Sequence, residues 1–341
     1  MIRPLEFADI QVSSMRPIRR ILVAVKDPAA KSLPAVMKAA QLARAYGAHL
    51  ELFHAISTPL YVDGYSFDES IPHIERRTRN EQIGQLEKIA TRLRADGLKV
   101  DVSATWDFPI YEAVVRRASR DNSDLIVAER HAKPHIAPGL LQLTDWELLR
   151  ASAVPVLLVK TPTPYRRPVV LAAVDPAHAL SKPAALDREI LGIAKSLSKA
   201  LDGPLHAVNA YVPVPTQPLS RRLESEAAVR QLVSETERAA RTRLLRLVRS
   251  THIPQAQCHL VGRHPINAIE QTARETHSRI VVMGAISRSG LKRFFFGNTA
   301  EALLDSLACD MLIVKPAQFA PRVQKRIRGV RLATAPFIPA F

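Results

Sequence analysis

The sequence repeats itself at a constant offset of 155 residues, and this duplication limits the fold more than any other feature. Shifting the chain by 155 residues brings 124–129 (DLIVAE) onto 279–284 (RIVVMG), and 154–160 (VPVLLVK) onto 309–315 (CDMLIVK), without a gap. Each segment is a short apolar run of the kind that forms a buried strand. The 341 residues are therefore predicted to hold two similar domains of about 150 residues each.

Strands and helices are expected to alternate along both copies. In the first copy the pattern predicts strands at 18–25, 48–56, 98–105, 124–128 and 154–160, helices that end at Gly47 and Gly97, further helices at 110–120 and around 146–150, and a polar loop at 57–73. The second copy repeats this order with strands at 169–174, 205–211, 256–261, 280–283 and 309–315, helices at 187–201, 229–248 and 265–276, and a loop at 212–220. This alternation predicts an α/β fold in which each copy is a five-stranded parallel sheet with helices on both faces.

Composition agrees with aliphatic cores in a reducing compartment. Hydrophobic residues make up 47% of the chain but aromatic residues only 5%, as in parallel sheets covered by helices. The two cysteines, Cys258 and Cys309, stand in apolar contexts, so no disulfide framework is expected. No apolar run approaches the roughly 18 residues of a membrane span, and residues 1–20 lack the apolar region of a signal peptide. We therefore expect a cytoplasmic protein without membrane insertion.

A net charge of +16 raises the question of nucleic-acid binding. The tail at 317–341 carries five basic residues and no acidic one, and 221–250 carries eight arginines against four glutamates. A solvated helix face with a disordered tail explains these charges most simply. No aromatic platform for RNA stands beside them. Nucleic acid is therefore an alternative partner that the sequence does not favour.

The stretch from 279 to 316 combines a strand, a glycine-containing loop and a helix start. Gly284 and Gly297 bound the loop, and Asn298 and Thr299 open the helix. Backbone N–H groups at a helix start attract anions, and glycines let a ligand approach the backbone closely. Glu129 stands in the first copy where Gly284 stands in the second, and Gln142 where Gly297 stands. The first copy is therefore expected to have lost such a loop.

These motifs resemble the universal stress protein family, and the doubling resembles its tandem E-type bacterial members. The second copy carries GNTAE at 297–301, then Cys-Asp at 309–310 and Lys-Pro at 315–316. The first copy carries Thr-Asp-Trp at 144–146 and Leu-Leu-Arg at 148–150. The resemblance covers about 18 to 318. It implies domains at 18–160 and 169–316, a Pro-rich linker at 161–168 and a basic tail at 317–341.

What the resemblance implies is binding of ATP with magnesium by the second domain. The family's Asp after the first strand matches Asp175, and its loop glycines and hydroxyl match Gly284, Gly297 and the pair Asn298 and Thr299. Three positions depart from the family's pattern, namely Ser287 for a glycine, Asn298 for a Ser or Thr, and Ala210 for a valine. Both Asn298 and Ser287 can still serve a weakened pocket. Catalysis is not expected, although slow ATP hydrolysis stays open.

The resemblance also implies an intramolecular pseudo-dimer, because single-domain relatives pair through the last strand and both last strands are present here. Whether two such pseudo-dimers associate stays open. Other readings stay open too: Asp175 could cap a turn with Pro176, and either Lys26 or Asp27 could be its counterpart. Two alternative functions also stay open. One is a ligand-independent interaction or RNA-associated role, and the other is binding of an apolar, lipid-like ligand framed by the loops at 57–73 and 212–220.

No metal site is expected. His131 and His135 have helical spacing near Glu129, but Pro134 and Pro138 interrupt any helix there.

Overall fold

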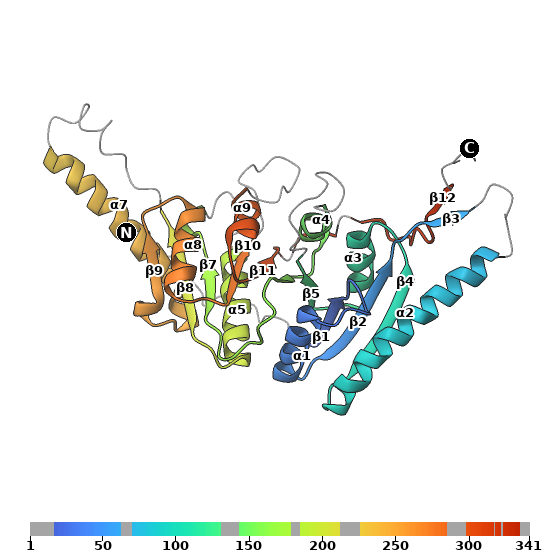
Figure 1. The fold of residues 1–341 in the computed structure, drawn as a ribbon. Helices are drawn as coiled ribbons and strands as arrows, with labels where there is room; N and C mark the ends of the chain where they lie inside the picture. Colours follow the sequence, from blue (N-terminus) through green and yellow to red (C-terminus); the bar gives the residue numbers. More distant parts are fainter. Residues whose placement is uncertain are drawn as a thin grey trace, which may run out of the picture.

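The computed structural model describes residues 17–62, 70–130, 143–178, 185–211, 226–284, 298–316, 318–321 and 323–334. These residues form one ten-stranded sheet with helices on both faces and a separate two-stranded sheet (Figure 1). The first half of the chain runs from β1 to β6 and the second half from β7 to β11.

The first half contains β1 (Arg20–Ala24), α1 (Pro34–Tyr46), β2 (His49–Ile56), β3 (Leu60–Val62), α2 (Ser70–Ala95), β4 (Val100–Trp106), α3 (Ile110–Arg120), β5 (Leu125–Glu129), α4 (Leu143–Ala151) and β6 (Val156–Val159). The second half contains β7 (Val170–Ala173), η1 (Pro176–His178), α5 (Ala185–Ala200), β8 (Leu205–Ala210), α7 (Glu226–Val248), η2 (Arg249–Thr251), η3 (Gln255–Gln257), β9 (Cys258–Val261), α8 (Pro265–Glu275), β10 (Ile280–Gly284), α9 (Asn298–Ser306) and β11 (Asp310–Val314). One further strand, β12 (Leu332–Thr334), follows.

The strands of the large sheet follow the order β4-β2-β1-β5-β6-β11-β10-β7-β8-β9. Neighbours within each half are parallel, whereas β6 and β11 pair antiparallel where the halves meet. The strand order of the second half is therefore the reverse of that of the first half, counted outward from the β6–β11 joint. This confirms the predicted fold, two α/β repeats packed against each other through their last strands.

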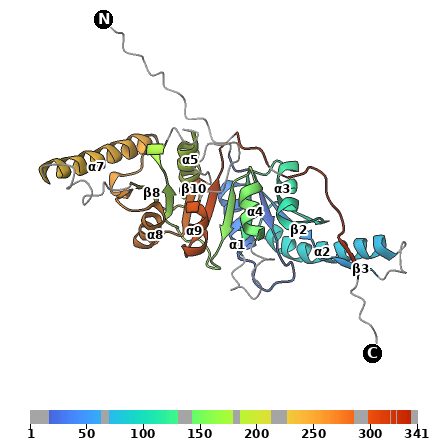
Figure 2. The ribbon, with the colours of Figure 1, turned by 90° about the horizontal axis from the view of Figure 1, so that it is seen from above.

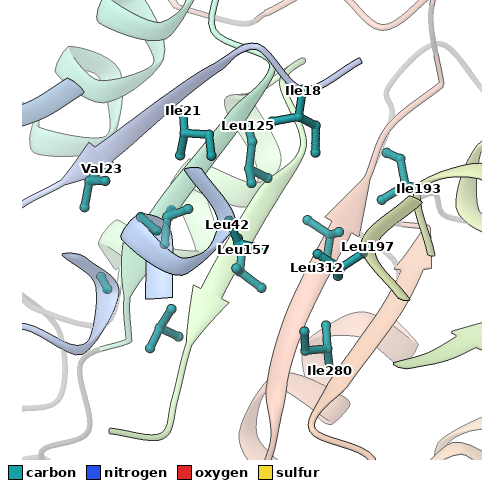
Figure 3. Packing of buried hydrophobic residues seen from close by; sticks show 14 of the residues in the cluster. Ile18, Ile21, Val23, Leu42, Leu125, Leu157, Ile193, Leu197, Ile280 and Leu312 are labelled. Carbon is teal, nitrogen blue, oxygen red and sulfur yellow. The ribbon is translucent and has the colours of Figure 1, made fainter. Parts of the chain in front are cut away.

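Two apolar layers sandwich the sheet. Helices α1, α2, α5 and α7 cover one face, and α3, α4, α8 and α9 cover the other. Figure 3 shows the first face near the joint, where Leu42 and Leu157 on one side match Leu197 and Leu312 on the other. Because both halves bury aliphatic side chains at equivalent places, the packing follows the repeat in the sequence.

Gly47 ends α1 as predicted. Its φ of 63° lies in the left-handed region, and its N–H donates to the carbonyl groups of the last turn of α1. A residue with a side chain is strained in this conformation, which explains a glycine at this C-cap.

The loop expected at 57–73 is partly wrong, because it contains β3 and the first residues of α2. The two elements escaped prediction for separate reasons. Strand β3 pairs in parallel with β12, more than 250 residues away in sequence, so local sequence carries no sign of it. The start of α2 has only Ile71 and Ile74 at helical spacing, and the next apolar residue at such spacing does not come until Ile83.

The last residues return from the second half to the first half and form what we call the C-terminal strap, residues 318–321 and 323–334 (Figures 1 and 2). Phe319 is buried, the N–H of Leu60 donates to the carbonyl of Arg331 at 2.8 Å, and β12 continues this pairing. The interpretation of the whole tail as a disordered, solvated segment is therefore wrong for these residues.

Candidate ligand site at the carboxyl edge of the sheet

The carboxyl ends of β7, β8 and β10 bring three of the expected site residues to one edge of the sheet. β7 pairs with β10 on one side and β8 on the other, so Asp175, Ala210 and Gly284 follow or end neighbouring strands. The chain leaves β7 toward the α5 face, whereas β10 continues toward α9 on the opposite face. Such a switch point in a parallel sheet opens a crevice outside the strand ends, where ligands of α/β proteins bind.

Strand pairing settles which residue of the first half corresponds to Asp175. The N–H of Val25 donates to the carbonyl of Phe53 at 2.8 Å, and the N–H of Val174 donates to that of Val208 at 3.0 Å. Because these two bonds are equivalent, the next residue in the first half, Lys26, matches Asp175. Asp27 lies one position further on, and its Oδ1 accepts the N–H of Ala29 at 2.9 Å in a local turn.

Buried polar side chains that sequence reasoning missed surround Asp175. Its N–H donates to Oδ1 of Asp187, a buried residue in the first turn of α5, at 3.1 Å. Asn209 is also buried, and its Nδ2 donates to the carbonyl of Val174 at 3.1 Å. An Asp in the first helical turn is a signal that could have pointed to Asp187; Asn209 stands inside an apolar strand and offers none in the pattern.

His54 occupies the place of Asn209 in the first half. Its Nδ1 lies 2.8 Å from the carbonyl oxygen of Val25. Burial lowers the pKa of His54, so the neutral ring with a proton on Nδ1 is the donor here. Both halves thus use a side chain of their second strand to satisfy the carbonyl of the residue that directly follows their first strand.

Gly284 is explained by close packing. A Cβ at this position would lie 2.7 Å from Cδ2 of Leu186 and 3.2 Å from Cδ1 of Ile190, both on α5. The space beside the glycine on that face is therefore already filled by protein. Any ligand at this edge has to approach Gly284 from beyond the strand end.

The remaining expected residues belong to the loop and helix that follow β10. Asn298 and Thr299 begin α9, and Thr299 is half-buried. Ser287 and Gly297 lie outside the described residues, as do His131 and His135. The described residues thus bring Asp175, Ala210 and Gly284 together, and the expected phosphate loop between β10 and α9 lies outside them.

A pocket lies at the opposite, amino edge of the sheet, in the first half. This cavity of about 100 Å³ is lined by Arg20, Ile21, His49, Glu51, Asp101, Arg117, Asp121 and Ser123. Arg117 forms ion pairs with Glu51 and with Asp121, both at 2.6 Å. Its central charges therefore neutralise one another, which makes it a structural network rather than a binding site for a charged ligand.

Among the described residues, no three His, Cys, Asp or Glu side chains gather closely enough to hold a metal ion. Cys258 and Cys309 are both free thiols. The helices in the described ranges also include none with the length and apolar character needed to cross a bilayer.

Comparison with known proteins places this architecture in a family. The family model described as the universal stress protein family matches twice, at residues 17–160 and 168–315. Universal stress protein E of Photorhabdus laumondii is 26% identical over 306 residues, covering 87% of this chain and 95% of its own. Universal stress protein E of Escherichia coli K12 is 25% identical over 315 residues, covering 89% and 96%.

Solved structures agree in fold. A functionally unknown protein of Pseudomonas aeruginosa PAO1 is 25% identical with a TM-score of 0.67, covering 89% of this chain and 94% of its own. A universal stress protein of Archaeoglobus fulgidus is 15% identical with a TM-score of 0.59, covering 88% and 99%. The two matches of the family model together span most of the chain, in the order that the two halves of the sheet require. The chain belongs to the universal stress protein family, as a tandem member similar to the E type.

Proposed function

We propose that the protein acts in the stress response by binding an adenine nucleotide, such as ATP with magnesium, at the carboxyl edge of its second half. Family membership supports the stress-response role. The observation that carries the ligand proposal is the difference between the halves at equivalent positions. Asp175 and Gly284 stand where the first half has Lys26 and Glu129.

These residues fit an adenine nucleotide in part. Asp175 places a carboxylate acceptor at the switch point, and Ala210 leaves a small side chain at the end of β8. The start of α9 supplies backbone N–H groups for phosphate oxygens. Leu186 and Ile190 fill the α5 side of Gly284, so phosphates would contact the backbone from the α9 side. Ser287 and Gly297 would complete the loop.

Titration calorimetry with ATP and magnesium tests this proposal. Asp175→Ala is expected to abolish binding, because it removes the carboxylate but leaves the backbone N–H that bonds Asp187. Lys26→Ala, at the equivalent position of the first half, is the matched control and is expected to leave binding unchanged. The proposal would be refuted if millimolar nucleotide gave neither binding heat nor a shift in Tm. Equal loss of affinity in Asp175→Ala and Lys26→Ala would also refute it.

The same proposal assigns binding without chemistry. Hydrolysis of bound ATP would need a general base beside the phosphates. If phosphate is released from ATP at the same rate in Asp175→Ala as in the wild type, the release comes from a contaminating enzyme. The RNA-associated alternative loses part of its support, since Arg328 of the basic tail is engaged by Glu112.

A further inference from the structure

The joint between the halves is a strand pairing that could in principle join two copies of the same half. In β6–β11, Leu312 pairs with Leu157, and Met311 and Ile313 pair with Leu158 and Val156. The offset of 155 relates Leu312 to its own partner Leu157 and converts the Met311–Leu158 pair into the Ile313–Val156 pair. By backbone and apolar contacts alone, β6 could therefore pair with β6 of a second chain, and β11 with β11.

A buried ion pair breaks this symmetry. Nζ of Lys38, on α1 of the first half, lies 2.5 Å from Oδ2 of Asp310, the first residue of β11, and both side chains are 0% exposed. The other oxygen of Asp310 accepts the N–H of Lys160 at 2.9 Å and that of Thr161 at 3.2 Å. Tyr165 donates its hydroxyl to Asp310 at 2.6 Å, and Thr161 Oγ1 accepts from Lys38 at 2.7 Å.

The equivalent positions carry no such charges. Pro155 holds the place of Asp310 in the first half. Ile193 holds the place of Lys38 in the second, because the strands that follow the two helices align Leu50 with Leu205 at the same offset. Ile193 is buried, like Lys38, so the two residues occupy the same kind of position.

Each homotypic pairing would consequently bury charges without their ion-pair partners. In a β11–β11 pair, Asp310 would face Ile193 in place of Lys38, and Pro316, which has no N–H, in place of Thr161. In a β6–β6 pair, Lys38 would face Pro155. Each homotypic pair would contain two such charges, and a buried charge stripped of its partner is disfavoured on the order of 100-fold or more.

We propose that Lys38 and Asp310 make the last strands of the two halves selective for each other, so that each half rejects a second copy of itself. The partner that each edge fits is a last strand with the complementary charge. For the first half this is a strand that begins with a carboxylate. For the second half it is a strand whose neighbouring helix carries a buried lysine.

Exchange between cut chains tests the selectivity. A protease site inserted in the full-length chain between Thr163 and Pro164, in an exposed part of the linker, allows the halves to separate after folding. Cut protein with and without ¹⁵N labelling is mixed, partly unfolded in urea, refolded and weighed by native mass spectrometry. The wild type is expected to exchange labels but to form only pairs of a first half with a second half.

The variant Lys38→Leu with Asp310→Leu removes both charges and is expected to raise the fraction of homotypic pairs clearly above that of the wild type. The fraction is expected to stay below one half, the value without discrimination, because the C-terminal strap and the ion pairs Arg130–Asp305 and Arg150–Glu301 also join the halves. The control Arg44→Leu with Asp96→Leu removes an exposed ion pair that also starts on α1, and is expected to behave as wild type. If the leucine variant fails to refold, Lys38→Met with Asp310→Asn provides the same comparison. Abundant homotypic pairs in the wild type, or equal fractions in the charge-free variant and the control, would overturn the proposal.

Discussion

Replacing Arg328 by Ala is expected to loosen the C-terminal strap by about 1–2 kcal/mol. The guanidinium donates to both carboxylate oxygens of Glu112, at 2.9 and 3.1 Å. The side chain of Glu112 is 10% exposed and that of Arg328 is 36% exposed, so this pair is stronger than a fully solvated one. The loss stays below that of a deeply buried pair, because Glu112 keeps its 2.8 Å ion pair with Arg116.

The backbone contacts of the strap survive the substitution. The N–H of Arg328 still donates to Oδ1 of Asp107 at 3.0 Å, and the carbonyl of Gln324 still accepts from Arg116 at 3.0 Å. The strap should therefore open more often without detaching completely. At 1–2 kcal/mol, the open fraction rises about 5- to 30-fold.

Hydrogen exchange followed by mass spectrometry measures this opening directly. Peptides that cover β3 and β12 are expected to exchange about 5- to 30-fold faster in Arg328→Ala, while peptides of the central strands keep their protection. Arg326→Ala is the control, because Arg326 is exposed and forms no ion pair within the described chain. Equal exchange of the strap in the two variants would refute the reasoning.

Three further perturbations concern half-buried residues. Burial, with Arg130 nearby, lowers the pKa of Lys160 to about 8. The unfolded chain therefore binds more protons than the folded chain between pH 8 and about 10.5, and the free energy of unfolding should rise with pH in this range. Urea titrations of Lys160→Met should lack this part of the rise. Nδ1 of His206 lies 2.9 Å from Nε2 of His259, and burial lowers both pKa values, although Glu275 partly raises that of His259. Stability should therefore fall as pH drops below about 6.5, and His206→Gln with His259→Ser should flatten that fall between pH 7 and 5. Gly284→Ala should cost about 1–3 kcal/mol by overpacking against α5, seen as a lower Tm without nucleotide; an unchanged Tm would contradict the packing explanation.

The repeat and the order of elements were predictable because each depends on apolar patterns within short stretches of the sequence. The helix expected at 110–120 has the same bounds in the structure, and the strand after Gly47 begins two residues after it. Apolar runs bounded by glycine or proline mark such elements whatever the rest of the chain does. Strands β3 and β12 have three residues each and depend on each other across the whole sequence, so no local pattern could indicate them.

The sequence indicated which residues of the candidate site stand at strand ends but not what surrounds them, and their role in binding stays a prediction. Sequence alone left Lys26 and Asp27 as competing counterparts of Asp175, and hydrogen bonding between strands was needed to choose Lys26. The glycine motif suggested room for a ligand at Gly284, whereas the structure shows one face of that glycine filled by Leu186. Motifs report which residue types a backbone tolerates, and packing decides whether a glycine makes room for a ligand or for a helix.

The joint illustrates what fusion of two domains permits. In a symmetric homodimer each residue occurs on both sides of the axis, so the joint has to be complementary to itself. A lysine at position 38 would then occur in both copies. Each lysine would find a carboxylate across the joint only if both copies also carried an Asp at position 310. In the fused chain Lys38 occurs only on the first half and Asp310 only on the second, and the two meet once. Asp310, one of the residues on which the resemblance was based, is thus held by a residue 272 positions earlier in the chain. Selectivity of this kind needs two halves that differ in sequence, and the 155-residue repeat supplies them within one chain.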